Sequence, residues 1–371
     1  MCHVQHTHRA IWFAPLVFCY SLLCPYITGV RQMQRTVIGL DVGHSAVKAV
    51  AYSRLGRQET IFPTFVTPAF AITGDPNEMA KCERETVEVG GARYFFGETA
   101  AAQGRMKNVV GLNADWVETP EYRVLMKAAL HRLKEGGVPE LDEALIVGGL
   151  PADNFGARKD RLKDIITTLF PGVEAMAMQQ PAGALWAHLL DATGTPVTER
   201  SLAKQRWGVV EVGHFTSDFL LMEKGRFIQT ANGSCQGVSR AVEYVVSWLE
   251  DQGIKATPEI AMEAMENNSL IVRGNRVDVS VQVAEASNLL AQQVIDEARS
   301  RHGQDVDFMD GVVVAGGGAS LVIDRLQALG WTHAVVADAP PGRPRFSVAE
   351  GFARYGNGIL LIRQQQAKKR A

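Results

Sequence analysis

The 371-residue chain lacks the short motifs that would assign its chemistry at once. Its five cysteines are odd in number and include no Cys-x-x-Cys pair, which argues against a disulfide framework and a zinc ribbon. No Gly-x4-Gly-Lys-Ser/Thr sequence occurs, so a P-loop is excluded, and no Gly-x-Gly-x-x-Gly follows the first predicted strand. A reducing, cytoplasmic location is the simplest expectation for this cysteine usage.

The chain also lacks an excess of charge of either sign. Charged residues make up 21% of the sequence and the formal net charge is -2, while hydrophobic residues make up 46%. This composition is typical of a globular protein and indicates neither bulk nucleic-acid binding nor membrane-surface binding. The length allows two domains, or one fold with two lobes.

A long apolar run lies near the N-terminus, at residues 11–30. Its length would suit a membrane anchor or a cleaved signal peptide, but Pro15 and Pro25 interrupt it. Met33 would make a natural start for the folded protein, so we expect residues 1–32 to be a disordered extension or a start-site artefact. We expect no membrane contact unless residues 11–30 are a real anchor.

Two stretches of the sequence look like copies of one device. In residues 37–52 and again in residues 209–227, an apolar strand ends in a carboxylate and turns through glycine into a second strand. The carboxylates are Asp41 and Glu211, and each stretch is typical of a β-hairpin with an acid beside its turn. Two such hairpins predict two similar half-molecules that face each other across a cleft.

The remaining pattern alternates strands with helices. Apolar spacing predicts a hairpin at 86–97, strands at 58–66, 143–151 and 308–314, and helices at 120–134, 155–170, 238–251, 258–266, 281–301 and 347–363. Residues 232–237 are expected to form a glycine-rich turn that feeds a helix start, which is a ready anion site. We expect the chain to divide into an N-terminal lobe 33–192, a linker 193–206, a second lobe 207–345, a C-terminal helix 346–363 and a frayed tail 364–371.

Three glycine-bearing turns follow predicted buried strands, at residues 43–45, 213–216 and 316–318. Glycine allows positive φ and lets backbone N–H groups approach a charged ligand closely. Triphosphate oxygens are the obvious ligand, although a glycine after a strand is by itself more often an ordinary turn.

The order and spacing of these motifs resemble the nucleotide-binding fold of actin, Hsp70 and sugar kinases over about residues 33–360. Within that superfamily the chain is most similar to the ParM/StbA actin-like ATPases that segregate plasmids, including the ParM-like component of PRTRC systems. The likeness rests on both hairpin turns, on Gln180-Pro181-Ala182, on the Gly-Leu-Pro at 149–151 and on the triple glycine. It implies an α/β, actin-like (ribonuclease H-like) fold with two lobes, each a mixed sheet flanked by helices, and a nucleotide cleft between them.

The resemblance also implies chemical roles. Asp41 would hold Mg²⁺ through water, with Glu211 contributing from the second lobe. Asp218 would either support the metal site or be structural. Gln180, or with less support Gln179, would orient the attacking water, because phosphoryl transfer depends on positioning and charge stabilisation.

The same resemblance implies how a nucleotide would be held. Backbone N–H groups of the two hairpin turns would clamp the phosphates from opposite lobes, Lys48 would add charge, and the triple glycine would let adenine and ribose lie against backbone. ATP is the expected nucleotide, with GTP as the alternative. The implied nucleotide-binding residues are Gly43, His44, Ser45, Lys48, Gly213, His214, Phe215, Thr216, Gly316, Gly317 and Gly318.

The chain departs from the family's usual pattern at the same site. Family members usually carry Asp where this chain has Glu211, and they often carry Glu where it has Gln180. Phe215 is bulky for a phosphate turn. His44 and His214 are expected to act through their backbone, or alternatively through a side-chain hydrogen bond to phosphate. A glutamine can position water but cannot take a proton, which suits slow hydrolysis.

The leading functional hypothesis is an ATP-hydrolysing protein that forms filaments and partitions plasmids through a DNA-binding adaptor, with plasmid DNA contacted only indirectly. The first alternative is a nucleotide-sensing scaffold of the same fold with little turnover. The second is a small-molecule kinase, for which the sequence offers no clear carboxylate base.

Overall fold

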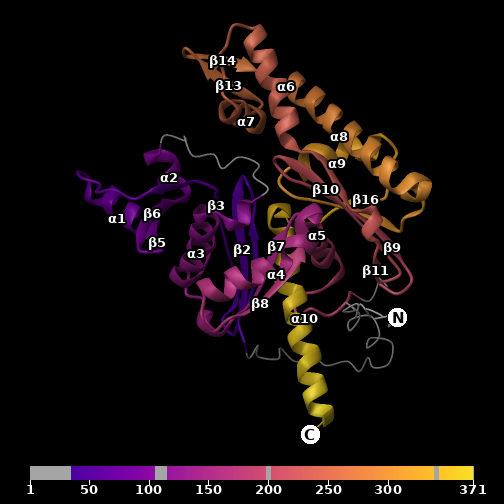
Figure 1. Cartoon of the computed structure of the whole chain (residues 1–371). Helices are drawn as coiled ribbons and strands as arrows, with labels where there is room; N and C mark the ends of the chain where they lie inside the picture. Colours follow the sequence, from indigo (N-terminus) through magenta and orange to yellow (C-terminus); the bar gives the residue numbers. More distant parts are fainter. Residues whose placement is uncertain (1–34, 105–114, 198–201, 338–341, 371) are drawn as a thin grey trace, which may run out of the picture.

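The computed structural model describes residues 35–104, 115–197, 202–337 and 342–370. Two sheets, each flanked by helices, form two lobes, which confirms the predicted fold class (Figure 1). The expectations for residues 1–32, including the anchor at 11–30, lie outside the described residues. None of the helices in the described ranges is both long and apolar enough to span a bilayer.

Lobe I is built on a five-stranded sheet of order β3-β2-β1-β7-β8. The first three strands are antiparallel, and β1, β7 and β8 are parallel to one another. Helices α3 and α4 cover one face through a large apolar cluster, while α10 packs on β1, β2 and β7 from the other side. The bounds are β1 Val37–Val42, β2 Ala46–Ser53, β3 Gly56–Pro63, β7 Leu145–Leu150, β8 Glu174–Gln179, α3 Pro120–Glu135, α4 Ala152–Leu169 and α10 Ser347–Arg370.

A smaller three-stranded sheet of order β4-β6-β5 extends lobe I. It contains the predicted hairpin at 86–97, whose turn glycines Gly90 and Gly91 both have positive φ. Two short helices, α1 and α2, lie with it, and a 3-10 turn, η1, contacts α3. The bounds are β4 Val66–Pro68, β5 Thr86–Val89, β6 Ala92–Phe96, α1 Pro76–Arg84, α2 Gly97–Gln103 and η1 Trp116–Glu118.

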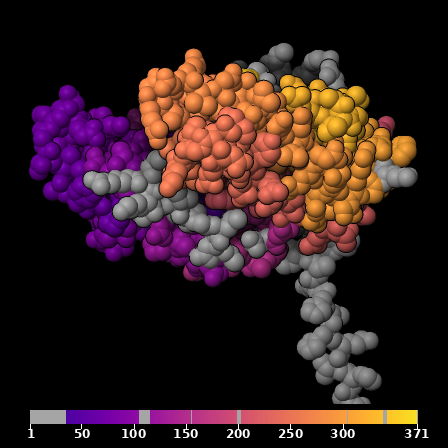
Figure 2. Space-filling view, turned by 90° about the horizontal axis from the view of Figure 1, so that it is seen from above, coloured from indigo at the N-terminus to yellow at the C-terminus, as the bar shows by residue number. Residues whose placement is uncertain are grey.

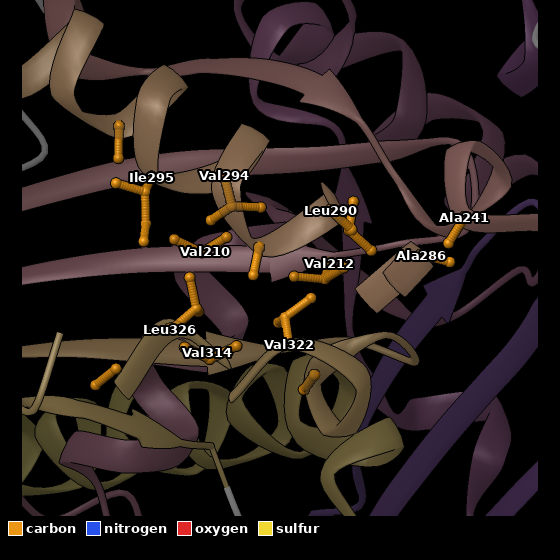
Figure 3. Packing of buried hydrophobic residues seen from close by; sticks show 14 of the residues in the cluster. Val210, Val212, Ala241, Ala286, Leu290, Val294, Ile295, Val314, Val322 and Leu326 are labelled. Carbon is orange, nitrogen blue, oxygen red and sulfur yellow. The ribbon is translucent and has the colours of Figure 1, made fainter. Parts of the chain in front are cut away.

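Lobe II repeats the strand order of lobe I. Its main path is β11-β10-β9-β15-β16, and β12 pairs with β10 beside it. Apolar side chains of α8 and α9 pack together on one face of β9 and β15, as Figure 3 shows for Val210, Val294 and Leu326. The bounds are β9 Arg206–Val212, β10 Thr216–Glu223, β11 Arg226–Phe227, β12 Gly233–Gln236, β15 Gly311–Ala315, β16 Ala334–Val336, α6 Val238–Asp251, α8 Ser280–His302 and α9 Ala319–Ala328.

A small extension of lobe II holds α7 (Pro258–Asn267) and the hairpin of β13 (Ser269–Val272) and β14 (Asn275–Asp278). Viewed from above, the indigo and magenta of lobe I lie beside the orange of lobe II (Figure 2). The β13–β14 hairpin is not among the elements predicted from the sequence.

Two helices join the lobes. Helix α5 (Gln180–Leu189) packs along α10, and one apolar cluster joins both helices to the strands of both sheets. The helices approach so closely that a Cβ added at Gly351 would come within 1.7 Å of the carbonyl oxygen of Gly183. This contact places the start of α5, and with it Gln180, between the two hairpins.

Two sequence expectations need correction. Residues 233–236 form a strand, β12, rather than a glycine-rich turn, because their backbone pairs with β10. The tail expected to be frayed continues α10 as far as Arg370, and Figure 1 shows this end of the helix projecting from the body. Extending an already formed helix is cheap, and the cations at its end suit the helix dipole.

Candidate functional site

A cavity of about 420 Å³ lies between the two hairpins. All the site residues expected from the sequence line it except Gly316, so the two lobes bring together what the sequence separates by more than a hundred positions. The expected residues on its wall are Asp41, Gly43, His44, Ser45, Lys48, Gln180, Glu211, Gly213, His214, Phe215, Thr216, Asp218, Gly317 and Gly318.

The two hairpins present different charges from equivalent positions. In the first, Asp41 of β1 lies opposite Lys48 of β2, and the two side chains form an ion pair at 3.2 Å. In the second, Glu211 of β9 lies opposite Asp218 of β10 in the same register relative to its turn. Lobe I therefore offers a neutralised pair, and lobe II offers two acids side by side.

Neither acid of lobe II forms an ion pair within the described residues, although the charge of Lys48 lowers the pKa of Glu211 slightly against the effects that raise it. Burial raises the pKa of Asp218, which is 2% exposed, to about 7, although Thr216 Oγ1 donates to its carboxylate at 3.0 Å. Burial, followed by the charges of Asp218 and Asp41, raises the pKa of Glu211 to about 8. A divalent cation beside Glu211 would lower the pKa of both carboxylates, because a nearby opposite charge favours the ionised form.

The donor set fits Mg²⁺ held with a nucleotide rather than by protein alone. Within the described ranges, no group of three or more His, Cys, Asp or Glu side chains is arranged to hold a metal ion. Mg²⁺ usually keeps several waters and takes one or two carboxylates together with phosphate oxygens. Asp41 and Glu211 are the carboxylates suited to that role here.

Gln180 is held at the floor of the site. Its Nε2 donates to Asp41 Oδ1 at 2.8 Å, which leaves the side-chain oxygen as an acceptor. Gln179, the less favoured candidate, does not line the cavity, and its side-chain oxygen accepts a hydrogen bond from Asn232 at 3.3 Å. The geometry therefore supports Gln180 over Gln179.

Each hairpin turn has some N–H groups free for an anion, but not all those expected. The N–H groups of Gly43 and Gly213 close their own turns by donating to Ala46 and Thr216 at 3.2 and 2.8 Å. The N–H groups of the two residues after each glycine donate to no atom of the described residues. These residues are His44, Ser45, His214 and Phe215.

The start of α6 supports the second turn instead of forming an anion site of its own. The N–H groups of Gly237, Val238 and Ser239 donate to the carbonyl oxygens of residues 213–215 at 2.6 to 3.0 Å. A Cβ at Gly237 would lie 2.4 Å from the carbonyl oxygen of Gly213, so glycine is required there. The prediction of an anion site at the start of this helix is therefore wrong, because its N–H donors are already hydrogen-bonded to carbonyl oxygens of the turn.

The triple glycine lies at the end of β15. Gly316 has a φ of +85°, and a Cβ there would lie 2.4 Å from the carbonyl oxygen of Val212, so it serves close packing rather than lining the cavity. Gly317 has open space where a Cβ would point. Gly318 lines the cavity but is also closely packed, since a Cβ there would lie 2.5 Å from side-chain atoms of Val212 and Val238.

Several wall residues were not anticipated. Met262, Met265 and Glu266 come from α7, and Ser320 and Leu321 come directly after the triple glycine at the start of α9. Arg345 reaches the wall from the segment before α10, and no ion pair of this side chain occurs within the described residues. Val238 and Pro151 complete the set. Ser320 and Leu321 could have been assigned to the site from the sequence, because they follow the glycines closely. The helix at 258–266 was predicted, but no sequence pattern connected it with the site.

Comparisons with known proteins agree with this architecture. The family model of the actin-like protein N-terminal domain matches residues 39–175, and that of the archaeal actin homologue MreB-like C-terminal domain matches residues 209–328. Together these matches cover more than half of the chain. No curated protein sequence matches it.

Solved structures resemble almost the whole chain at low sequence identity. A 15-stranded ParM filament from Clostridium botulinum matches with a TM-score of 0.68 and 18% identity, covering 87% of this chain and 99% of that one. The archaeal actin homologue Ta0583 in complex with ADP gives 0.62 and 19%, covering 88% and 99%. Bacillus thuringiensis ParM with ATP gives 0.60 and 12%, covering 89% and 100%. With both lobes matched by family models, the chain belongs to the actin-like proteins and has the ParM-type fold.

Proposed function

We propose that this protein binds ATP with Mg²⁺ between its lobes, hydrolyses it slowly, and assembles into filaments in step with the nucleotide state. The observation that carries the proposal is the pair of facing turns with free N–H groups around one cavity that also holds Asp41, Lys48 and Glu211. The nucleotide-bound and filamentous relatives support it by analogy of fold.

The residues of the cleft divide the work of phosphoryl transfer. Lys48 and the N–H groups of both turns would bind phosphate oxygens, while Gln180 would use its free side-chain oxygen to hold the attacking water in line. Bound Mg²⁺, held through water by Asp41 and Glu211, would supply positive charge to the phosphates. Since Gln180 cannot accept a proton, slow turnover is expected.

Filament formation would follow the closure of the lobes on the nucleotide. A ligand held by both turns binds the closed arrangement better than an open one, and so shifts the population toward it. Plasmid partition through a DNA-binding adaptor is the biological role that suits the ParM-type fold, and the PRTRC group is the subtype that we propose. GTP remains the alternative nucleotide.

A nucleotide-sensing scaffold is the second candidate. The favouring observation is that the hydrogen bond from Gln180 Nε2 to Asp41 fixes the direction of the side-chain oxygen, so that turning this oxygen toward a water elsewhere in the cleft would cost the bond. Such a protein would bind nucleotide and partners with very little turnover.

One experiment separates the two candidates. The full chain is mixed with ATP and Mg²⁺ while light scattering and phosphate release are followed together. The motor predicts scattering that rises with ATP and decays as phosphate is released, whereas the scaffold predicts binding with neither signal. Glu211→Ala should abolish turnover, while Glu250→Ala, an exposed position on α6, should leave it intact. Unchanged turnover in Glu211→Ala would overturn the assignment of this carboxylate.

A further inference from the structure

A continuous run of aromatic contacts crosses the cleft between the two hairpin turns. It begins with Tyr122 in the core of lobe I, passes through Trp116 and His44, and ends at Phe215 and His214 in lobe II. Neither the order of the motifs nor the likeness to actin-like proteins gives the rings of Trp116 and Phe215 a role.

The lobe I half of the run is firmly supported. The His44 ring stacks on Trp116, with ring centroids 5.6 Å apart and planes 25° from parallel. Trp116 is 5% exposed and packs edge-on against the buried Tyr122 at 5.4 Å. The ring of His44 is therefore held on the wall of lobe I rather than free in the cleft.

The lobe II half comes from the facing turn. Phe215 meets His44 edge-on at 5.8 Å between ring centroids and also contacts His214 at 4.5 Å. Both His44 and Phe215 line the cavity. This contact joins the lobes at the turns themselves. It is separate from the hydrogen bond that Ser234 Oγ in lobe II donates to Asp153 in lobe I at 2.7 Å.

The residues whose rings touch are also residues whose N–H groups are free. The N–H groups of His44 and Phe215 have no acceptor among the described residues. An anion bound by both turns at once must lie between the backbones that carry these two touching rings, in the cavity that both residues line. A shorter phosphate chain, bound by one turn alone, can leave the contact in place.

We propose that the contact between His44 and Phe215 discriminates nucleoside triphosphates from diphosphates, because the terminal phosphate must separate the two rings to reach both turns. This inference rests on the proposed nucleotide site. The pair opposes triphosphate binding and leaves diphosphate binding unaffected, so it sets the ratio of the two affinities. Trp116 acts as a positioning residue that holds His44 in place.

The test compares dissociation constants for ADP and for a non-hydrolysable ATP analogue, both with Mg²⁺. Phe215→Ala removes the ring contact and should tighten the analogue relative to ADP by about 2- to 10-fold, the range expected for an edge-to-face pair. Phe227→Ala is the matched control, since Phe227 makes a similar edge contact with Trp186 at 6.0 Å outside the cavity, and the ratio should not change.

The outcomes are distinct. An equal change in both affinities, or a ratio that matches the wild type, overturns the inference while leaving the nucleotide site in place. Absence of binding by the wild type overturns the proposed function and the inference with it.

A second readout needs no change at Phe215. Separation of the rings alters the surroundings of Trp116, so the tryptophan fluorescence of the wild type should change with the triphosphate analogue and not with ADP. Trp116→Phe identifies the contribution of this residue among the six tryptophans. An identical fluorescence change with both nucleotides contradicts the inference.

Discussion

Replacing Gly351 by alanine should destabilise the protein even though alanine is the better helix former. A Cβ at Gly351 would lie 1.7 Å from the carbonyl oxygen of Gly183 and 2.6 Å from the amide nitrogen of Ala187. Both are backbone atoms of α5, so no flexible side chain can move aside. Helices α5 and α10 would have to separate by roughly 1.5 Å to restore ordinary contact distances.

The magnitude follows from two opposing terms. Overpacking a dense core typically costs about 1–3 kcal/mol, and a clash between backbones lies at the upper end of that range. The higher helix propensity of alanine returns about 1 kcal/mol. We therefore expect Gly351→Ala to lower the free energy of unfolding by about 1–2 kcal/mol, with a matching fall in the urea midpoint.

The matched control is Gly156→Ala in α4. Gly156 is exposed, and a Cβ there would meet no atom within 4 Å, so only the helix propensity changes. This variant should gain about 0.5–1 kcal/mol. Urea denaturation followed by far-ultraviolet circular dichroism measures both. If Gly351→Ala is as stable as the wild type or shifts with its control, the close contact between α5 and α10 is not what joins the lobes.

Three further variants test other parts of the account. Glu350→Ala should cost about 3–5 kcal/mol, because this fully buried carboxylate accepts hydrogen bonds from Tyr52, Arg57 and Arg354 that would lose their partner. Burial alone would raise the pKa of Glu350, but Tyr52 and the two arginines outweigh burial and lower this pKa. In acid denaturation, the wild type should therefore lose stability as the pH falls below about 4.5. Glu350→Gln should lose less stability over the same pH range. Gly237→Ala should weaken ATP binding about tenfold or more in equilibrium titrations, because its Cβ would push the second turn, and unchanged affinity would contradict the supporting role of α6.

The sequence predicted the parts of the fold that local pattern determines. Both hairpins, their acids and helices such as the one predicted at 120–134 were identified, because alternation, glycine turns and helical spacing are determined within a few residues of each element. The resemblance then placed them around one cleft. Neither source predicted that Lys48 and Asp218 occupy equivalent positions, since that depends on the pairing register.

What the sequence missed depends on contacts between distant segments. Strand β12 has little intrinsic strand preference and exists because β10 offers it an edge. The N–H groups of residues 237–239 are taken up by the carbonyl oxygens of residues 213–215, and no local pattern in the sequence indicates this pairing. The β13–β14 hairpin, by contrast, could have been predicted from the sequence, because a two-residue turn ending in glycine, Arg273-Gly274, separates its two strands. Both turn residues have positive φ in the structure.

Hydrogen exchange at the two hairpin turns tests the central claim most directly. In the proposed complex, one phosphate chain contacts the free N–H groups of both turns, at His44 and Ser45 in lobe I and at His214 and Phe215 in lobe II. Adding a non-hydrolysable ATP analogue with Mg²⁺ should slow amide exchange in both turns together. Slowed exchange in only one turn, or in neither while the nucleotide is bound, would contradict it.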